Sequence, residues 1–302
     1  MPESPSTETL YRDHGDYLWG LAFRMLGVRA DADEVVQDTF VRLLRAEPDR
    51  DRDLRPWLVR VATNLARDRL RARKRESYVG PWLPAVTEVV AESEPITGGR
   101  YTSIESLSLS FLWAAEQLDD VQRAVLVLRD VLGHSVREVA ETLELSESNV
   151  KVIAHRVRAR MRGWETKQRR SLSVPHEQII DTMRRFFGSV AAGDRQGAEA
   201  VLAEDVRVLS DGAGEFFAAR KPVVGAHKVA GFYLKLAQGQ GHPPSIELRI
   251  LGGLPTLVLR RDPKDEQSAP VICLQVLLDD AGRISQVYSV LATEKVRNML
   301  SC

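Results

Sequence analysis

The sequence predicts a multidomain protein with two all-α bundles, the second containing a helix-turn-helix, followed by an α+β domain. Three observations support this fold class. Apolar residues recur at helical spacing through most of residues 7–171. A stretch rich in proline and glycine interrupts that pattern at residues 78–106. From residue 176 onward, two amphipathic helices are followed by short runs of Val, Ile and Leu, which predict antiparallel strands.

Composition limits the classes of function. The chain has 302 residues, enough for two or three domains, and a formal net charge of zero, so only local charge patches can indicate a nucleic-acid partner. Cys273 and Cys302 are far apart, which predicts no disulfide framework or cysteine-based metal site and fits a reducing cytoplasm. The N-terminus lacks a signal-peptide pattern, and no apolar run approaches the roughly 20 residues that span a bilayer. We therefore expect a cytoplasmic protein without a metal or cofactor.

A helix-turn-helix is the strongest local signal. Ser135 and Glu138 form a capping box ahead of a short amphipathic helix, and Ser146 is a suitable N-cap for the next helix. This second helix has an apolar stripe on one side and a series of cations with almost no acids on the other. Like charges at helical spacing repel one another, so an anionic partner is expected, and a nucleic-acid backbone is the commonest one.

The second helix of a helix-turn-helix enters the major groove, with its N-terminal residues facing base edges. A plain three-helix bundle that binds no DNA is the alternative. We favour DNA binding and predict that the base and phosphate contacts come from Ser148, Asn149, Lys151, His155 and Arg156.

Residues 31–44 predict another amphipathic helix, with an acidic and polar face formed by Glu34, Gln37 and Asp38. An acidic first turn suits the helix dipole, and a docking surface for a basic partner is the other interpretation. The residues alone do not decide between these two. The apolar face is predicted to consist of Val36, Phe40, Leu43 and Leu44.

Residues 54–76 predict a second cationic helix, in which Pro56 suits the first turn. Between Arg55 and Arg75 there are eight Lys and Arg residues and one acid, Asp68. This density is too high for an ordinary solvated face and is typical of helices that bind a nucleic-acid backbone.

The proline- and glycine-rich stretch at residues 78–106 is acidic and reads as a linker. One feature is unusual for a linker, because Trp82 and Leu83 stand between Pro81 and Pro84. Such a rigid apolar pair would be a liability if it were exposed to solvent. We therefore expect it to dock into another domain.

The C-terminal α+β domain contains few candidate catalytic side chains. An Asp before glycines, as at Asp211, is most often a turn residue, and the sequence shows no Ser-His-Asp pattern, metal-ligand cluster or phosphate-binding glycine loop. A regulatory domain is therefore favoured over an enzyme. The candidates for acid–base chemistry are Asp211, Glu215, His227 and Tyr288.

Together these elements resemble the extracytoplasmic-function (ECF) sigma factors. The resemblance covers residues 7–170 and depends on "DADEVVQDTFVRL", then "RPWLVRVATNLARDRLR", and then "LDDVQRAVLVLRDVLGHSVREVAETLELSESNVKVIAHRVRARMR". The C-terminal part resembles the SnoaL-like domain, in which a curved sheet and helices enclose a cone-shaped pocket. The resemblance implies four parts: a region-two domain (1–77), a flexible linker (78–106), a region-four domain (107–171) and a SnoaL-like regulatory domain (176–302).

One ECF subgroup with a SnoaL-like domain has a Trp-Leu-Pro linker motif, which is present here as Trp82-Leu83-Pro84. Its Asp-Gly-Gly-Gly-Lys motif corresponds to Asp211-Gly212-Ala213-Gly214-Glu215, which departs at the third and last positions. The last change reverses a charge, so a role of that lysine does not carry over. A final Asn-Pro-Asp-Lys-Leu motif is echoed only by Glu294-Lys295.

The resemblance implies a function, which is promoter-specific transcription initiation, modulated in cis by the C-terminal domain. Core RNA polymerase and promoter DNA would be the partners, without a membrane. An unidentified small molecule in the C-terminal pocket is left open. The alternatives are an ordinary DNA-binding repressor, or a sigma-like regulator whose C-terminal domain is a ligand-binding or isomerase- or cyclase-like module.

The resemblance also implies roles for particular residues. Core polymerase would be bound by Glu34, Gln37 and Asp38. The promoter element near the start site would be opened by Asn64, Arg67 and Arg71. The distal element would be read by Ser148, Asn149, Lys151, His155 and Arg156. Interdomain regulation would use Trp82, Leu83, Pro84, Asp211, Glu215 and Lys295.

Overall fold

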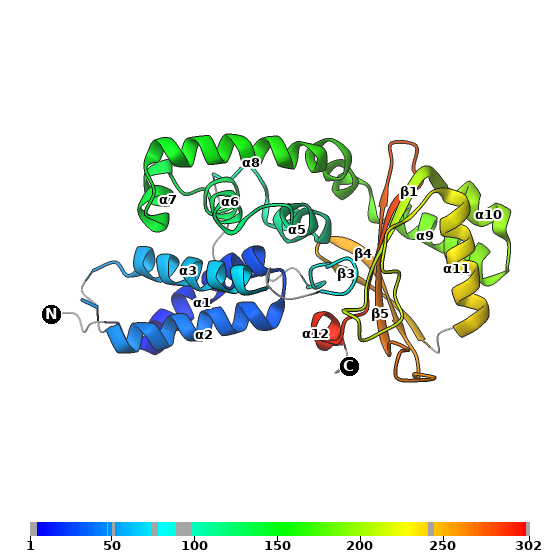
Figure 1. Cartoon of the computed structure of the whole chain (residues 1–302), viewed down its shortest axis with the longest axis horizontal. Coiled ribbons are helices and arrows are strands. Elements are labelled where there is room, and N and C mark those ends of the chain that lie inside the picture. Colours follow the sequence, from blue (N-terminus) through cyan, green and yellow to red (C-terminus); the bar gives the residue numbers. More distant parts are fainter. Residues whose placement is uncertain are drawn as a thin grey trace. The chain divides into compact units, whose positions relative to one another are not determined.

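The chain was analysed as a computed structural model (Figure 1), which describes residues 5–46, 48–49, 52–73, 78–88, 98–240 and 245–299. The chain divides into two compact units. The first contains residues 1–77, 89–107 and 111–162, and the second contains residues 78–88, 108–110 and 163–302. Part of the predicted linker, residues 78–88, therefore belongs to the same unit as the C-terminal domain.

The first unit begins with a bundle of α1 (Thr7–Leu26), α2 (Arg29–Ala46) and α3 (Arg55–Arg73). Ser6 caps α1 by accepting a hydrogen bond from the amide of Thr9, and Gly27, with φ of 68°, ends the helix. In α2, Val36, Phe40 and Leu43 are buried as expected. The prediction for Leu44 was wrong, since it is 53% exposed. The buried stripe instead includes Val35, because it runs along residues 32, 35, 36, 39, 40 and 43, and Leu44 lies outside it.

The second half of this unit contains α4 (Ser103–Leu107), α5 (Leu109–Ala115), α6 (Asp120–Val125), α7 (Val136–Leu143) and α8 (Glu147–Lys167). The expected capping box of Ser135 and Glu138 is present at α7. At α8, Ser146 Oγ accepts a hydrogen bond from the amide of Asn149 at 3.2 Å. A π-helical segment, Leu126–Val131, follows α6 directly. These elements confirm the predicted helix-turn-helix at α7 and α8.

The second unit is built on a sheet of β1 (Leu202–Asp211), β2 (Val223–Val224), β3 (Ser245–Leu251), β4 (Leu254–Arg260), β5 (Val271–Leu278) and β6 (Ile284–Val290). Its strand order is β2-β1-β6-β5-β4-β3. The β1–β6 pair is parallel and the other pairs are antiparallel, so the expectation of antiparallel strands alone was incomplete. The predicted hairpin turn joins β5 to β6, where Asp279 accepts hydrogen bonds from the amides of Ala281 and Arg283.

Helices cover both faces of this sheet. Figure 1 shows α9 (His176–Ala191), α10 (Arg195–Ala200) and α11 (Ala226–Gln240) on one side and α12 (Thr293–Val296) on the other. Short 3₁₀ segments lie at Arg169–Ser173 and Arg297–Met299. Because side chains alternate across a strand, Ser210 and Ser289, which are paired in register, point to one face, while Asp211 points to the other. The two faces therefore carry different sites.

Among the residues that the structure describes, no helix is both long enough and apolar enough to cross a membrane.

Candidate functional sites

The carboxylate of Asp211 is the centre of a buried polar cluster at the end of β1. Asp211 is 0% exposed, and its Oδ2 lies 2.6 Å from Lys295 Nζ and 2.6 Å from the backbone N of Leu83. Its Oδ1 accepts hydrogen bonds from the Tyr78 hydroxyl at 2.5 Å and from the amide of Ala213 at 3.0 Å. We call Tyr78, Leu83, Asp211 and Lys295 the Asp211 cluster. Four donors, one of which is the cationic Lys295, compensate the burial of this carboxylate.

The cluster binds the linker segment 78–88. Leu83 is fully buried, and the Thr87 carbonyl accepts a hydrogen bond from the amide of Gly252 at 2.6 Å. Trp82 is half-buried, and the Lys295 ammonium lies 4.3 Å from the centre of its indole ring. The Trp-Leu pair is therefore docked, and Leu83 is the more deeply buried of the two.

Glu215 stands where the subgroup motif has a lysine, and its carboxylate is a hydrogen-bond acceptor. Its Oε2 accepts a hydrogen bond, at 3.3 Å, from the amide of Thr293 in the first turn of α12. Before it, Ala213 adopts a φ of +52°, a conformation that glycine adopts more readily. The Asp211 side chain accepts from the amide two residues on, as expected of a turn residue, and it also binds the linker segment 78–88. Its predicted role in interdomain regulation stays a prediction. Nothing in the sequence pattern indicated Tyr78, which is the fourth member of the cluster.

Burial strongly raises the pKa of Tyr78, and the negative charge of Asp211 raises this pKa further. The Tyr78 hydroxyl therefore stays protonated and donates its hydrogen bond to Asp211 throughout the neutral pH range.

In the first unit, the predicted promoter-opening arginines are bound to a carboxylate of the same chain. Arg67 Nε and Arg71 Nη1 each lie 3.0 Å from Asp120 Oδ2, at the start of α6. Asn64 Oδ1 is 3.5 Å from Arg67 Nη1, so these three candidates lie together. Arg73, at the end of the same helix, pairs with Glu116 at 3.0 Å. The cationic face of α3 therefore packs against the helix-turn-helix half of the unit.

The predicted polymerase-docking side chains, Glu34, Gln37 and Asp38, are exposed on α2. Arg69 of α3 joins two of them, with Nη2 lying 3.3 Å from Glu34 Oε2 and 2.9 Å from Asp38 Oδ2. Burial lowers the pKa of Arg69, but the hydrogen bonds and charges of these two acids outweigh that effect and the pKa is raised. The acidic face is therefore held in place by a neighbouring helix.

The cations of α8 fall into two groups. Near the start of the helix, the five residues predicted to read DNA are all exposed: Ser148, Asn149, Lys151, His155 and Arg156. Farther along, Arg158 Nη2 lies 2.5 Å from Asp130, and Arg160 Nη1 donates to Gln122 Oε1 at 2.7 Å. Arg158 and Arg160 therefore have polar partners within the same chain, because tertiary packing brings groups from the preceding helical segments to them.

The candidate acid–base residues His227 and Tyr288 of the C-terminal domain lie in different environments. His227 Nδ1 lies 3.0 Å from Glu199 Oε1 on an exposed surface, and Tyr288 is fully buried in β6. Burial raises the pKa of Tyr288, so it is a poor proton donor at neutral pH. No group of three metal-ligating side chains occurs among the described residues.

Two parts of the first unit match families of sigma factor regions. Residues 10–76 match the family described as Sigma-70 region 2, and residues 110–161 match Sigma-70, region 4. The chain is 31% identical over 229 residues to the ECF RNA polymerase sigma factor SigJ of Mycobacterium tuberculosis (strain ATCC 25618 / H37Rv), covering 74% of this chain and 71% of SigJ. The chain belongs to the ECF sigma factors. It directs promoter-specific transcription initiation by RNA polymerase.

The similarity extends into the C-terminal domain of this ECF sigma factor. It is 30% identical over 241 residues to the probable ECF RNA polymerase sigma factor SigI of the same species, covering 78% of each chain. The crystal structure of SigJ superposes with a TM-score of 0.73 at 23% identity, covering 96% of this chain and 98% of SigJ. The fold is therefore shared over nearly the whole length, including the fused SnoaL-like domain.

The buried ion pair of the Asp211 cluster should contribute to stability. Lys295→Met leaves the Asp211 carboxylate buried without its opposite charge, and breaking such a pair typically costs about 3–5 kcal/mol. We expect urea denaturation of the full chain to show a loss of this size. Lys228→Met, which removes an exposed ammonium from α11, is the control and should change little. Equal stability of the two variants would mean that the ion pair contributes no net free energy.

Proposed function

We propose that, in the free sigma factor, the linker and the arginines Arg67 and Arg71 are bound to other parts of the same chain. Core polymerase replaces the contacts of the linker, and promoter DNA replaces those of the arginines. The observation that carries this proposal is the hydrogen bond of the Leu83 amide to the buried Asp211 carboxylate. A linker docked in this way cannot at the same time lie extended in a polymerase channel. Polymerase binding and linker docking therefore compete, and the two states differ in contacts, as a population shift requires.

Core polymerase binding is proposed for the exposed face of Glu34, Gln37 and Asp38. Its support is electrostatic, since Arg69 holds two of these acids side by side without covering them. A basic surface of a partner could bind this face in register.

Promoter opening is proposed for Asn64, Arg67 and Arg71. The Asp120 carboxylate binds the guanidinium groups of both arginines, much as a DNA phosphate would. Opening of the first unit would have to break these ion pairs before DNA could bind. Distal promoter recognition is proposed for the exposed start of α8, through Ser148, Asn149, Lys151, His155 and Arg156, where the helix is free to enter a major groove.

The C-terminal domain is proposed to regulate transcription in cis and not to catalyse a reaction. In support, Asp211 and Glu215 hold the linker and the start of α12, while His227 pairs with Glu199 on the surface. We propose a cytoplasmic location because the polymerase and promoter are there. We also propose that the acidic linker lies in the polymerase channel when core polymerase is bound. Two of its acids, Glu92 and Glu94, lie outside the described residues.

Reversing the charge of the α2 face should abolish function. Glu34→Lys/Asp38→Lys places two cations beside Arg69, so we expect loss of core polymerase binding and of transcription in vitro, with the helical circular dichroism unchanged. Glu204→Lys/Asp205→Lys makes the same charge change on an exposed part of β1 and is the matched control. Normal binding of core polymerase by the α2 variant would contradict the proposal that this face binds the polymerase.

Weakening the linker contact should activate the protein. Leu83→Ala removes a fully buried side chain, and such substitutions cost about 2–5 kcal/mol, so linker docking should become weaker. We expect faster amide hydrogen exchange in residues 78–88 and half-maximal transcription at a lower sigma concentration. Val79→Ala changes an exposed linker side chain and should behave as the parent. If Leu83→Ala speeds exchange without changing transcription, linker docking is not regulatory.

Removing the Asp120 charge should expose the arginines of α3. Asp120→Asn keeps the shape of the side chain but removes the ion pairs, which are worth roughly 1 kcal/mol for partly exposed groups. Fluorescence anisotropy of the free protein with fork-junction promoter DNA should show about fivefold tighter binding. Asp181→Asn, which removes an exposed ion pair with Arg184, is the control. Unchanged or weaker DNA binding by Asp120→Asn would contradict the proposed masking.

A further inference from the structure

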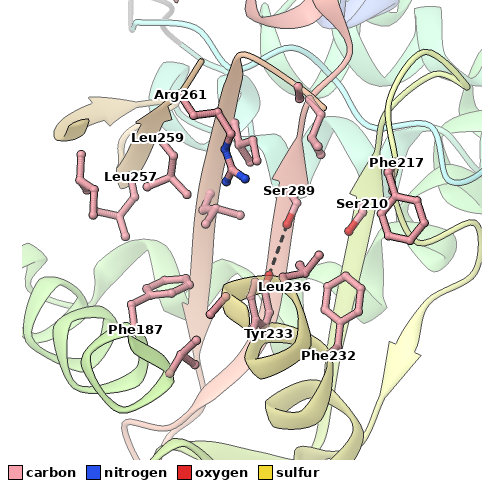
Figure 2. Close-up of a pocket in the computed structure, with 18 of the residues that line it drawn as sticks. Phe187, Ser210, Phe217, Phe232, Tyr233, Leu236, Leu257, Leu259, Arg261 and Ser289 are labelled. Carbon is pink, nitrogen blue, oxygen red and sulfur yellow. Dashed lines mark hydrogen bonds between the residues drawn. The ribbon is translucent and has the colours of Figure 1, made fainter. Parts of the chain in front are cut away.

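The SnoaL-like domain contains a cavity on the face of the sheet opposite the Asp211 cluster. It lies between the strands and helices α9 and α11 (Figure 2). Its volume is about 180 Å³. Aromatic side chains from the two helices, Phe187, Phe232 and Tyr233, form one wall, and leucines of β4, Leu257 and Leu259, line the sheet side. Such a wall favours an apolar body.

The dimensions of the cavity limit the ligand. An engineered cavity of about 150 Å³ in another protein stays dry and binds benzene, so this cavity suits a ligand of roughly ten non-hydrogen atoms if its end extends through the opening. Two lining residues are well exposed and mark that opening, since Phe217 is 64% exposed and Ile246 is 60% exposed. An apolar chain can therefore enter without unfolding the domain.

The polar groups of the cavity indicate the charge of the ligand. Figure 2 shows the Arg261 guanidinium pointing into the space between the sheet and the helices. Burial lowers the pKa of Arg261, since desolvation disfavours its cationic form. A carboxylate beside the guanidinium would offset this cost through a charge-assisted, two-point hydrogen bond. Ser210 also lines the cavity, and Ser289 Oγ lies 3.3 Å from the Tyr233 hydroxyl.

We propose that this cavity binds a small amphiphilic carboxylate, with its carboxylate on Arg261 and its apolar chain against the aromatic wall, and that binding changes the strength of linker docking. The second part rests on the proposed regulatory function of the linker.

The path from the cavity to the linker is short. Ser210 lines the cavity, and the next residue along β1 is Asp211, whose side chain lies on the opposite face and binds the linker. Leu291 also lines the cavity, and its amide donates to the Asp211 carbonyl at 2.8 Å. A ligand that moves β1 or the residue after β6 therefore acts directly on the Asp211 cluster. By linkage, linker docking must change ligand affinity by the same factor.

The first experiment measures binding of octanoate, octanol and octylamine to the full chain by calorimetry. These probes share an eight-carbon chain and differ in charge. We expect octanoate to bind at least tenfold more tightly than octanol, and octylamine to bind most weakly. Arg261→Met should remove the preference for octanoate while retaining octanol binding, which also shows that the cavity is intact. Arg185→Met, an exposed change on α9, should match the parent.

The proposed site is overturned if octanoate binds no more tightly than octanol, or if Arg261→Met binds octanoate as tightly as the parent. If the Arg261→Met variant does not fold, octanoate binding to the parent against octanol and octylamine decides the charge preference.

The second experiment measures hydrogen exchange in residues 78–88 with saturating octanoate and without it. A change of at least threefold in the parent, absent in Arg261→Met, supports coupling. Unchanged exchange with octanoate bound overturns the regulatory part of the inference.

The proposals of linker regulation and of ligand control remain distinguishable. If Leu83→Ala alters transcription but octanoate leaves linker exchange unchanged, linker regulation stands and ligand control fails. If octanoate alters exchange but Leu83→Ala leaves transcription unchanged, ligand coupling stands and the proposed function fails.

Discussion

The second unit depends on one buried carboxylate. Removing a carboxylate from water costs several kcal/mol even after relaxation, so Asp211 can be fully buried only with donors and an opposite charge around it. The four donors come from three separate places in the chain: the two linker residues Tyr78 and Leu83, the turn after β1, and Lys295 of α12. This requirement joins the linker, the sheet and the C-terminal helix.

The first unit uses the same principle with weaker partners. Arg67 and Arg71 pair with Asp120 at partly exposed positions, where ion pairs contribute little and can exchange for others. A nucleic-acid phosphate is such an exchange partner. The pair of Asp211 and Lys295 is different, because both side chains are buried and separating them would leave each charge without its partner away from water. Undocking the linker would leave this ion pair in place but would remove the Tyr78 and Leu83 donors from the buried Asp211 carboxylate.

The departure from the subgroup pattern at Glu215 has a physical explanation. At Glu215 a carboxylate replaces the motif's lysine, and it accepts a hydrogen bond from the start of α12, where a helix N-terminus favours negative charge. The positive charge beside Asp211 is supplied by Lys295. The negative charge of Glu215 also contributes to the raised pKa of the Tyr78 hydroxyl, so the charge reversal helps to keep that hydroxyl protonated.

The sequence by itself determined the local structure: the capping box of Ser135 and Glu138, the N-cap Ser146, the turn at Asp279, and the order of helices and strands. These features depend on hydrogen bonds between residues two to four positions apart and on the periodic spacing of apolar residues. Both can be read from a short stretch of the sequence. Only the tertiary structure decided that Lys295 meets Asp211, 84 residues away, that Asp120 meets Arg67, that β1 pairs in parallel with β6, and that Leu83 is buried more deeply than Trp82. Each of these depends on which distant surfaces the folded chain brings together, and spacing along the sequence carries no information about that.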